Sequence, residues 1–291
     1  MAAFETRFWT GPRSRGWMLV VLAGLCAGTV AHAASSRTTK TVRDGLTERN
    51  TFEWSGHLAP GKTLEIKDVN GAIRAEIASG SEIQVLASKS ARMSDPDRVK
   101  IEVIEHAGGV TLCTVYPSRG GGQPNECRPG EGGRMNVSNN DVRVDYRVKL
   151  PRGVKLVART VNGDVGAHGL ESDVEARTVN GSIEIATRGS ASAATVNGSI
   201  EVEMGNSSRE SALEFETVNG GITVTMPEGL GAEVEARTVN GEIETDFPLT
   251  VKGRFNTRRI RGTIGDGSRE LSLATVNGDI RLLSSRSRSS R

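Results

Sequence analysis

The tetrapeptide Thr-Val-Asn-Gly occurs six times in this chain, and this repetition constrains the fold more than any other feature. The copies are Thr160–Gly163, Thr178–Gly181, Thr195–Gly198, Thr217–Gly220, Thr238–Gly241 and Thr275–Gly278, and a near copy, Asp-Val-Asn-Gly, lies at Asp68–Gly71. The starts of the six copies are 18, 17, 22, 21 and 37 residues apart. Periods of about 20 residues are typical of stacked repeats. The last spacing is about two units, so Phe255–Gly265 is expected to hold a degenerate copy.

Each copy is flanked on both sides by residues that alternate between apolar and polar. In the second copy, Val174 and Ala176 precede the motif, and Ile183 and Ile185 follow it. A period of two is the pattern of a strand with one buried face. The Asn-Gly pair is typical of a sharp reversal, because Gly adopts positive φ without steric cost and Asn tolerates the left-handed region. Each unit is therefore predicted to be a strand, an Asn-Gly turn, a second strand and a loop.

Two all-β folds fit such a unit. In stacked β-hairpins forming a sandwich, Thr178 would pair with Ile183 across a two-residue loop. In a β-solenoid, each strand pairs instead with its copy in the next coil, about 4.8 Å away. The solenoid is favoured, because only stacking explains why Thr and Val recur before every Asn-Gly. The same stacking predicts a ladder of hydrogen-bonded turn side chains, which comprises Asn162, Asn180, Asn197, Asn219, Asn240 and Asn277.

The first 33 residues have the pattern of an export signal. Arg7, Arg13 and Arg15 precede the apolar run Trp17–Val30, and small residues precede the predicted cleavage between Ala33 and Ala34. The run is shorter than the roughly 20 residues of a spanning helix, so cleavage is favoured over a retained anchor. These residues hold three of the 37 basic and one of the 35 acidic side chains, which leaves 34 of each. This balance does not call for a nucleic acid or an anionic membrane as partner.

The remaining chain divides into four segments by pattern. Residues 34–50 are polar and are expected to be disordered. Residues 51–150 hold the near copy of the motif among strand-like runs, and are predicted to form an N-terminal β region with a Gly-rich disulfide loop. Residues 151–283 are the predicted repeat solenoid, and the Ser- and Arg-rich tail 284–291 is expected to be disordered.

Cys113 and Cys127 are the two cysteines that remain after the predicted cleavage. In an oxidising compartment a close pair is most simply a disulfide. Closing a loop of this length contributes about 3 kcal/mol in the chain-entropy model. A metal site is disfavoured, because it would need more ligands than two thiols.

The segments "LEIKDVNGAIRAE" and "VDYRVKLPRGVKLVARTVNGDVGAHGL", followed by serial TVNGxI units, resemble the putative-adhesin domain family of uncharacterised bacterial envelope proteins. The match covers about residues 50–283. The resemblance implies an all-β, solenoid-like protein outside the cytoplasm, and it supplies no catalytic residue that transfers to this chain.

Converging chemical groups are scarce in the sequence. His57, His106 and His168 are far apart, and no HExxH, GxSxG, P-loop or CxxC motif occurs. Outward carboxylates offer one enzyme hypothesis, because stacking brings copies within the distance that a glycosidase pair needs; these are Asp164, Glu242, Asp279, Glu184, Glu201 and Glu244. Their columns are mixed in residue type, which favours a solvated face.

We therefore expect a non-enzymatic protein of the cell envelope or exterior, a repeat scaffold that makes adhesin-like surface contacts or binds proteins. The alternative is a carbohydrate-active β-helix enzyme that uses the outward carboxylates. No cofactor and no metal is expected. The expected partner is an envelope protein or surface ligand, without nucleic acid and without a stable membrane span after signal cleavage. The location would be periplasmic or extracellular.

Overall fold

The computed structural model describes residues 35–44, 47–118, 123–205, 213–251 and 258–285. The predicted signal peptide, with its cleavage site at Ala33 and Ala34, lies outside these ranges, as do residues 286–291 of the predicted tail. The described chain is built of strands, with one short 3-10 turn at Pro96–Arg98. The all-β prediction is therefore confirmed.

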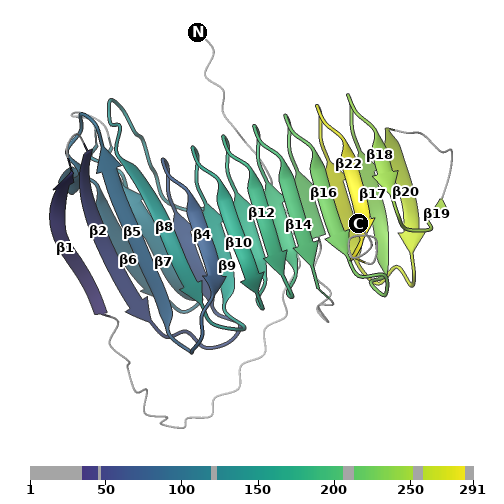
Figure 1. Cartoon of the computed structure of the whole chain (residues 1–291), viewed down its shortest axis with the longest axis horizontal. Coiled ribbons are helices and arrows are strands. Elements are labelled where there is room, and N and C mark those ends of the chain that lie inside the picture. The colour runs from purple at the N-terminus through teal and green to yellow at the C-terminus, as the bar shows by residue number, and fades with distance from the viewer. Residues whose placement is uncertain (1–34, 45–46, 119–122, 206–212, 252–257, 286–291) are drawn as a thin grey trace, which may run out of the picture. The chain divides into compact units, whose positions relative to one another are not determined.

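The strands form two long sheets (Figure 1). The first sheet has the order β1 (Ser35–Asp44), β2 (Thr47–Gly56), β5 (Ile83–Ala91), β8 (Arg143–Leu150), β4 (Ile73–Ile77), β10 (Val165–Leu170), β12 (Ile183–Thr187), β14 (Ile200–Met204), β16 (Ile222–Met226), β22 (Ile280–Ser284) and β18 (Ile243–Thr245). The second has the order β19 (Thr250–Val251), β20 (Arg259–Ile264), β17 (Ala232–Arg237), β21 (Glu270–Ala274), β15 (Leu213–Glu216), β13 (Ala191–Ala194), β11 (Val174–Arg177), β9 (Lys155–Arg159), β3 (Thr63–Lys67), β7 (Gly109–Val115) and β6 (Lys100–His106).

Consecutive strands of one repeat lie in different sheets. β11 precedes the turn at Thr178–Gly181 in the second sheet, and β12 follows it in the first sheet. β11 pairs in parallel with β9 and β13, and β12 pairs in parallel with β10 and β14. The strands of a unit thus pair with those of neighbouring coils, so the solenoid is confirmed and the hairpin alternative is wrong.

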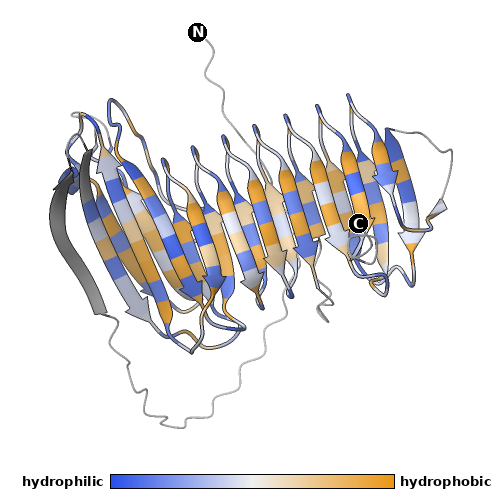
Figure 2. Ribbon diagram, in the orientation of Figure 1, coloured by the Kyte–Doolittle hydropathy of each residue, from blue (hydrophilic) through white to orange (hydrophobic). Residues whose placement is uncertain are grey.

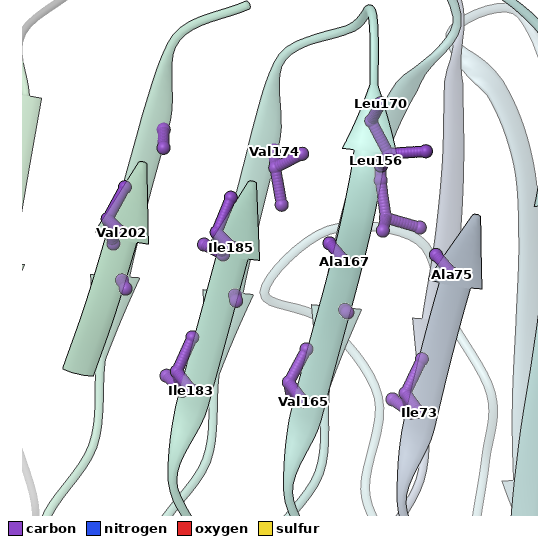
Figure 3. Packing of buried hydrophobic residues seen from close by; sticks show 14 of the residues in the cluster. Ile73, Ala75, Leu156, Val165, Ala167, Leu170, Val174, Ile183, Ile185 and Val202 are labelled. Atoms are coloured by element: carbon purple, nitrogen blue, oxygen red, sulfur yellow. The ribbon is translucent and has the colours of Figure 1, made fainter. Parts of the chain in front are cut away.

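The inward side chains of the two sheets form one apolar core. Corresponding positions stack in register from coil to coil, as Ile73, Val165 and Ile183 do on β4, β10 and β12 (Figure 3). Apolar and polar residues alternate along most strands of the stack, so one face of these strands is buried, as on β12 and β14 (Figure 2). Burial of this repeated apolar row favours folding, and its period of two fixes the register.

The stack begins earlier in the chain than the predicted boundary at residue 151. β3 pairs with β9 and β4 pairs with β10, so the coil at Asp68–Gly71 lies directly on the coil at Thr160–Gly163. The intervening residues add antiparallel strands at this end of the sheets, with β5 pairing to β2 and β8. The described part of residues 34–50, which is 35–44 and 47–50, also differs from the expected disorder, because β1 pairs antiparallel with β2. Their polar composition is compatible with an edge strand, since Thr and Val favour extended backbone.

The last copies do not stack in sequence order. β22 and β21, which flank Thr275–Gly278, lie between the strands of the fourth copy and those of the fifth copy. The expected degenerate copy at Phe255–Gly265 is wrong. Its described part forms β20, which runs antiparallel to β17 and has Gly262 in mid-strand.

The motif glycine is required by contact between coils. A Cβ atom on Gly181 would lie 2.1 Å from the carbonyl oxygen of Gly163 in the neighbouring coil, and one on Gly163 would lie 1.9 Å from that of Gly71. The ladder asparagines do not adopt positive φ, since Asn139 is the one described residue other than Gly that does. The expected left-handed Asn is therefore wrong, and close backbone approach explains the glycine.

Candidate functional site

The motif asparagines lie one above another along the turns and are linked by their side chains. Each Nδ2 donates to the Oδ1 of the preceding asparagine in the stack at 2.7–2.8 Å. The spatial order is Asn70, Asn162, Asn180, Asn197, Asn219, Asn277 and Asn240. The near copy thus supplies the first member, and the amide dipoles run in one direction.

The threonines and valines of the motif point to opposite sides. Thr195 is buried, and its hydroxyl donates to the Gly181 carbonyl of the neighbouring coil at 2.9 Å. The equivalent bond recurs at the other copies. The hydroxyls therefore bond the backbone instead of one another. The valines are partly exposed, from 37% at Val161 to 56% at Val239, so only the threonine is needed for the core.

A disulfide joins Cys113 to Cys127 and holds the following segment against the outer face of the second sheet. Glu131 of this segment lies 2.8 Å from Arg159 and 3.4 Å from Arg177, which are neighbours in register on β9 and β11. Buried Glu65 accepts hydrogen bonds from the Thr111 hydroxyl and the Gly130 amide. Glu131 of the loop, together with Glu175 of β11, which lies 3.1 Å from Arg159 and 3.4 Å from Arg177, thus neutralises an arginine pair that lies side by side on the sheet.

The near copy replaces the motif threonine with Asp68, a charge that sequence reasoning did not single out. Neither carboxylate oxygen meets a hydrogen-bond donor in good geometry among the described residues. Burial raises the pKa of Asp68 to about 7, although the Thr114 hydroxyl and the Val69 amide act against this shift. The Thr114 hydroxyl instead bonds Tyr146 Oη at 2.7 Å. Asp68 is thus a destabilising buried acid at the first coil.

The candidate carboxylates of the enzyme alternative do not form a cleft. Glu184 and Glu201 are exposed neighbours in register on β12 and β14. Glu244 pairs with Arg281, with 3.2 Å between Oε2 and Nε. The remaining three lie by the turns, where Asp164 and Asp279 accept backbone N–H groups. A mixed solvated face describes this arrangement better than a pair of catalytic acids, so it does not favour the enzyme.

The histidines are likewise separate. His57 contacts the Ser81 carbonyl, His106 contacts Thr111, and His168 lies 3.8 Å from Glu184. Within the described ranges, no group of three His, Cys, Asp or Glu side chains is placed to hold a metal ion. The same part of the chain contains no helix long and apolar enough to cross a membrane.

A groove of about 920 Å³ crosses the outer face of the first sheet. It is lined from five neighbouring strands, β2, β5, β8, β4 and β10. Arg74 and Arg147 lie side by side in register at its centre, and Leu86 and Gly166 continue the same row. Lys149 and His168 also line it, with Glu53, Glu76 and Glu82. The groove therefore carries both signs of charge.

The central cations of the groove have no ion-pair partner within the described chain. Arg74, Arg147 and Lys149 are exposed, and none lies within 4.0 Å of a carboxylate of a described residue. Alternation in "AIRAEI" and "VDYRVKL" predicts that these side chains point outward. It does not predict that they meet, because β4 and β8 are about 70 residues apart in the chain.

Comparison with known proteins adds a family and distant structural likenesses. The model of the family described as Toastrack DUF4097 matches residues 135–283, just over half of the chain. The chain is similar to a putative cell adhesion protein from Clostridium sporogenes, with 13% identity, a TM-score of 0.45, and coverage of 80% of this chain and 98% of that chain. It is also similar to a putative adhesin from Bacteroides fragilis, with 10% identity, a TM-score of 0.31, and coverage of 80% and 96%. No curated protein matches it.

The matched region contains all six copies of the tetrapeptide and the strands that pair around them. It therefore coincides with the part of the chain in which each coil repeats the same turn, threonine and asparagine contacts. The chain belongs to the Toastrack DUF4097 family.

Proposed function

We propose that this protein is a non-enzymatic scaffold of the cell envelope or cell exterior, which makes adhesin-like contacts with a protein through the outer face of its first sheet. The observation that carries the proposal is the groove around Arg74 and Arg147, because its central cations have no carboxylate of a described residue within 4.0 Å. A partner with complementary charge would be steered to such a surface and oriented on it.

The ladders support a scaffold role for the stack. Asparagine amides, threonine hydroxyls and glycine contacts fix each coil against its neighbours. Outward side chains are consequently displayed at a regular spacing of about 4.8 Å along the sheet. A surface of this kind binds through many positions, as concave repeat proteins do.

Two independent features support this location. The disulfide between Cys113 and Cys127 is stable in oxidising compartments. The pattern of residues 1–33, with cleavage between Ala33 and Ala34, is that of an export signal. Both support a periplasmic or extracellular protein, and mass spectrometry of the envelope form should find a chain that begins at Ala34.

A capture experiment tests the contact role. The protein is purified from expressing cells, biotinylated, incubated with solubilised envelope fractions and cross-linked. We expect a specific cross-linked species that is lost in the double variant Arg74→Ala with Arg147→Ala. A matched control, Arg98→Ala with Lys100→Ala, removes two exposed cations elsewhere and should retain it. Capture that is equal for all three proteins would show that the groove is not the contact surface.

A further inference from the structure

The charges on the outer face of the first sheet are arranged about β10. Residues in register with Gly166 on the neighbouring strands form a row across the sheet. On one side, this row contains Arg74 on β4 and Arg147 on β8. On the other side, the same row contains Glu184 and Glu201, on β12 and β14. The two arginines and the two glutamates thus lie on opposite sides of Gly166. Each pair occupies the first and second strands counted from β10.

Like charges directly opposite one another on neighbouring strands are unfavourable without a counter-charge. The second sheet shows how this chain accommodates such a pair. Arg159 and Arg177 are neighbours there, and Glu131 reaches over both from the disulfide loop. No described segment reaches over Arg74 and Arg147 in this way, so a second molecule can supply a counter-charge there.

We propose that the outer face of the first sheet pairs with the same face of a second copy of this chain, about a twofold axis that runs along β10. This inference rests on the proposed function, since it names the partner of that same surface. A rotation about this axis places β4 opposite the β12 of the other copy, and β8 opposite its β14. Arg74 then faces Glu184 and Arg147 faces Glu201, and symmetry forms each pair twice.

Charges outside the central row agree with this axis. Lys149 follows Arg147 by two residues on β8, and Glu203 follows Glu201 by two residues on β14, so they also meet. At the ends of the row, Glu53 on β2 is placed opposite Arg281 on β22. The exceptions lie on the axis itself, where Asp164 and His168 each face their own copy.

The shape of the face fits the same arrangement. The groove lies on the half of the sheet that runs from β2 to β10. In the pair, the strands from β12 to β22 of the other copy pack against this half. Gly166 lies on the axis and has no side chain of its own, and the His168 imidazole lies beside it, so the two copies meet there through this ring. The nine strands from β2 to β22 span about 38 Å by 17 Å, a footprint of roughly 650 Å² per copy. This approaches the ~800 Å² per partner of a standard interface.

Charge exchange between two variants tests the pairing. Sedimentation velocity of the purified protein should show a monomer–dimer equilibrium that weakens as salt is raised. Arg74→Glu with Arg147→Glu should raise the dimer Kd at least tenfold, and so should Glu184→Arg with Glu201→Arg. An equimolar mixture of the two variants should associate again, within about threefold of the natural protein, which also shows that both are folded. Asp164→Asn should tighten the dimer.

The control Arg98→Glu with Lys100→Glu makes the same change in net charge away from this face and should leave the Kd unchanged. A monomer at all concentrations up to the millimolar range, or variants that do not associate with one another, would overturn the inference. Should such a monomer still capture a different envelope protein in a manner that depends on Arg74 and Arg147, the proposed function stands without the self-pairing. If the groove variants change neither the dimer Kd nor the capture of another protein, both proposals fail.

Discussion

Replacing Asp68 with Asn should stabilise the fold, and more so as the pH rises. The pKa of Asp68 in the folded protein is about 7, because the carboxyl is buried, against 3.8 for an unperturbed aspartate. The folded state therefore holds a proton that the unfolded state releases between these two values. The stability that this proton contributes is fully present at low pH, and it is lost as the pH rises from about 4 to about 7.

The size of this loss follows from the difference between the two pKa values. A difference of about three units corresponds to about 4 kcal/mol at pH 8. The carboxamide that Asp68→Asn introduces does not ionise and has nearly the same shape as the carboxyl, so the variant avoids this loss. Its advantage in free energy of unfolding should grow from near zero at pH 4 to as much as about 4 kcal/mol at pH 8.

Urea denaturation at pH 4, 6 and 8, followed by far-ultraviolet circular dichroism, measures the advantage directly. Glu102→Gln is the matched control, because Glu102 is exposed on β6 and its neutralisation should show no such trend. An advantage of Asp68→Asn that is equal at pH 4 and pH 8 would refute the reasoning, since it would show that Asp68 does not titrate differently in the folded state.

Three further changes probe the stack. Gly181→Ala should lower the free energy of unfolding by more than about 3 kcal/mol, because its Cβ would lie 2.1 Å from a neighbouring carbonyl oxygen, whereas Gly80→Ala, with open space, should be tolerated in thermal melts. Asn197→Ala removes two ladder bonds and should cost about 2 kcal/mol, with hydrogen exchange rising in both adjacent coils; a rise in one coil alone would contradict the ladder. Replacing Cys113 and Cys127 with Ser should cost about 3 kcal/mol, and unchanged melting would show that the bond is dispensable.

Much of the repeated architecture was predictable from the chain. Alternation around each Asn-Gly gives the inward rows, such as Ile183 and Ile200, and verbatim repetition favours pairing between coils. These features are local, or repeat at a nearly constant spacing, so the sequence displays them directly.

The remaining features depend on contacts between distant segments. The order of the fifth and sixth copies is decided by how the chain returns after β17, and no local pattern encodes it. The groove requires β4 to lie beside β8 and β10, which are far from it in sequence. The role of Gly181 does not follow from its tetrapeptide, because an isolated Asn-Gly indicates a turn angle and does not reveal a neighbouring carbonyl.

The placement of the sixth copy has a consequence for how the protein is made. A solenoid that stacks in sequence order grows by adding each coil as it leaves the ribosome or the translocation channel. Here, among the described strands, β18 pairs only with β22, so the fifth coil has no place in the first sheet until Ile280–Ser284 has been delivered. Until then, β16 presents an open edge to any extended chain nearby. Completion of this end therefore depends on β22, and a chain truncated before β21 would leave that edge exposed.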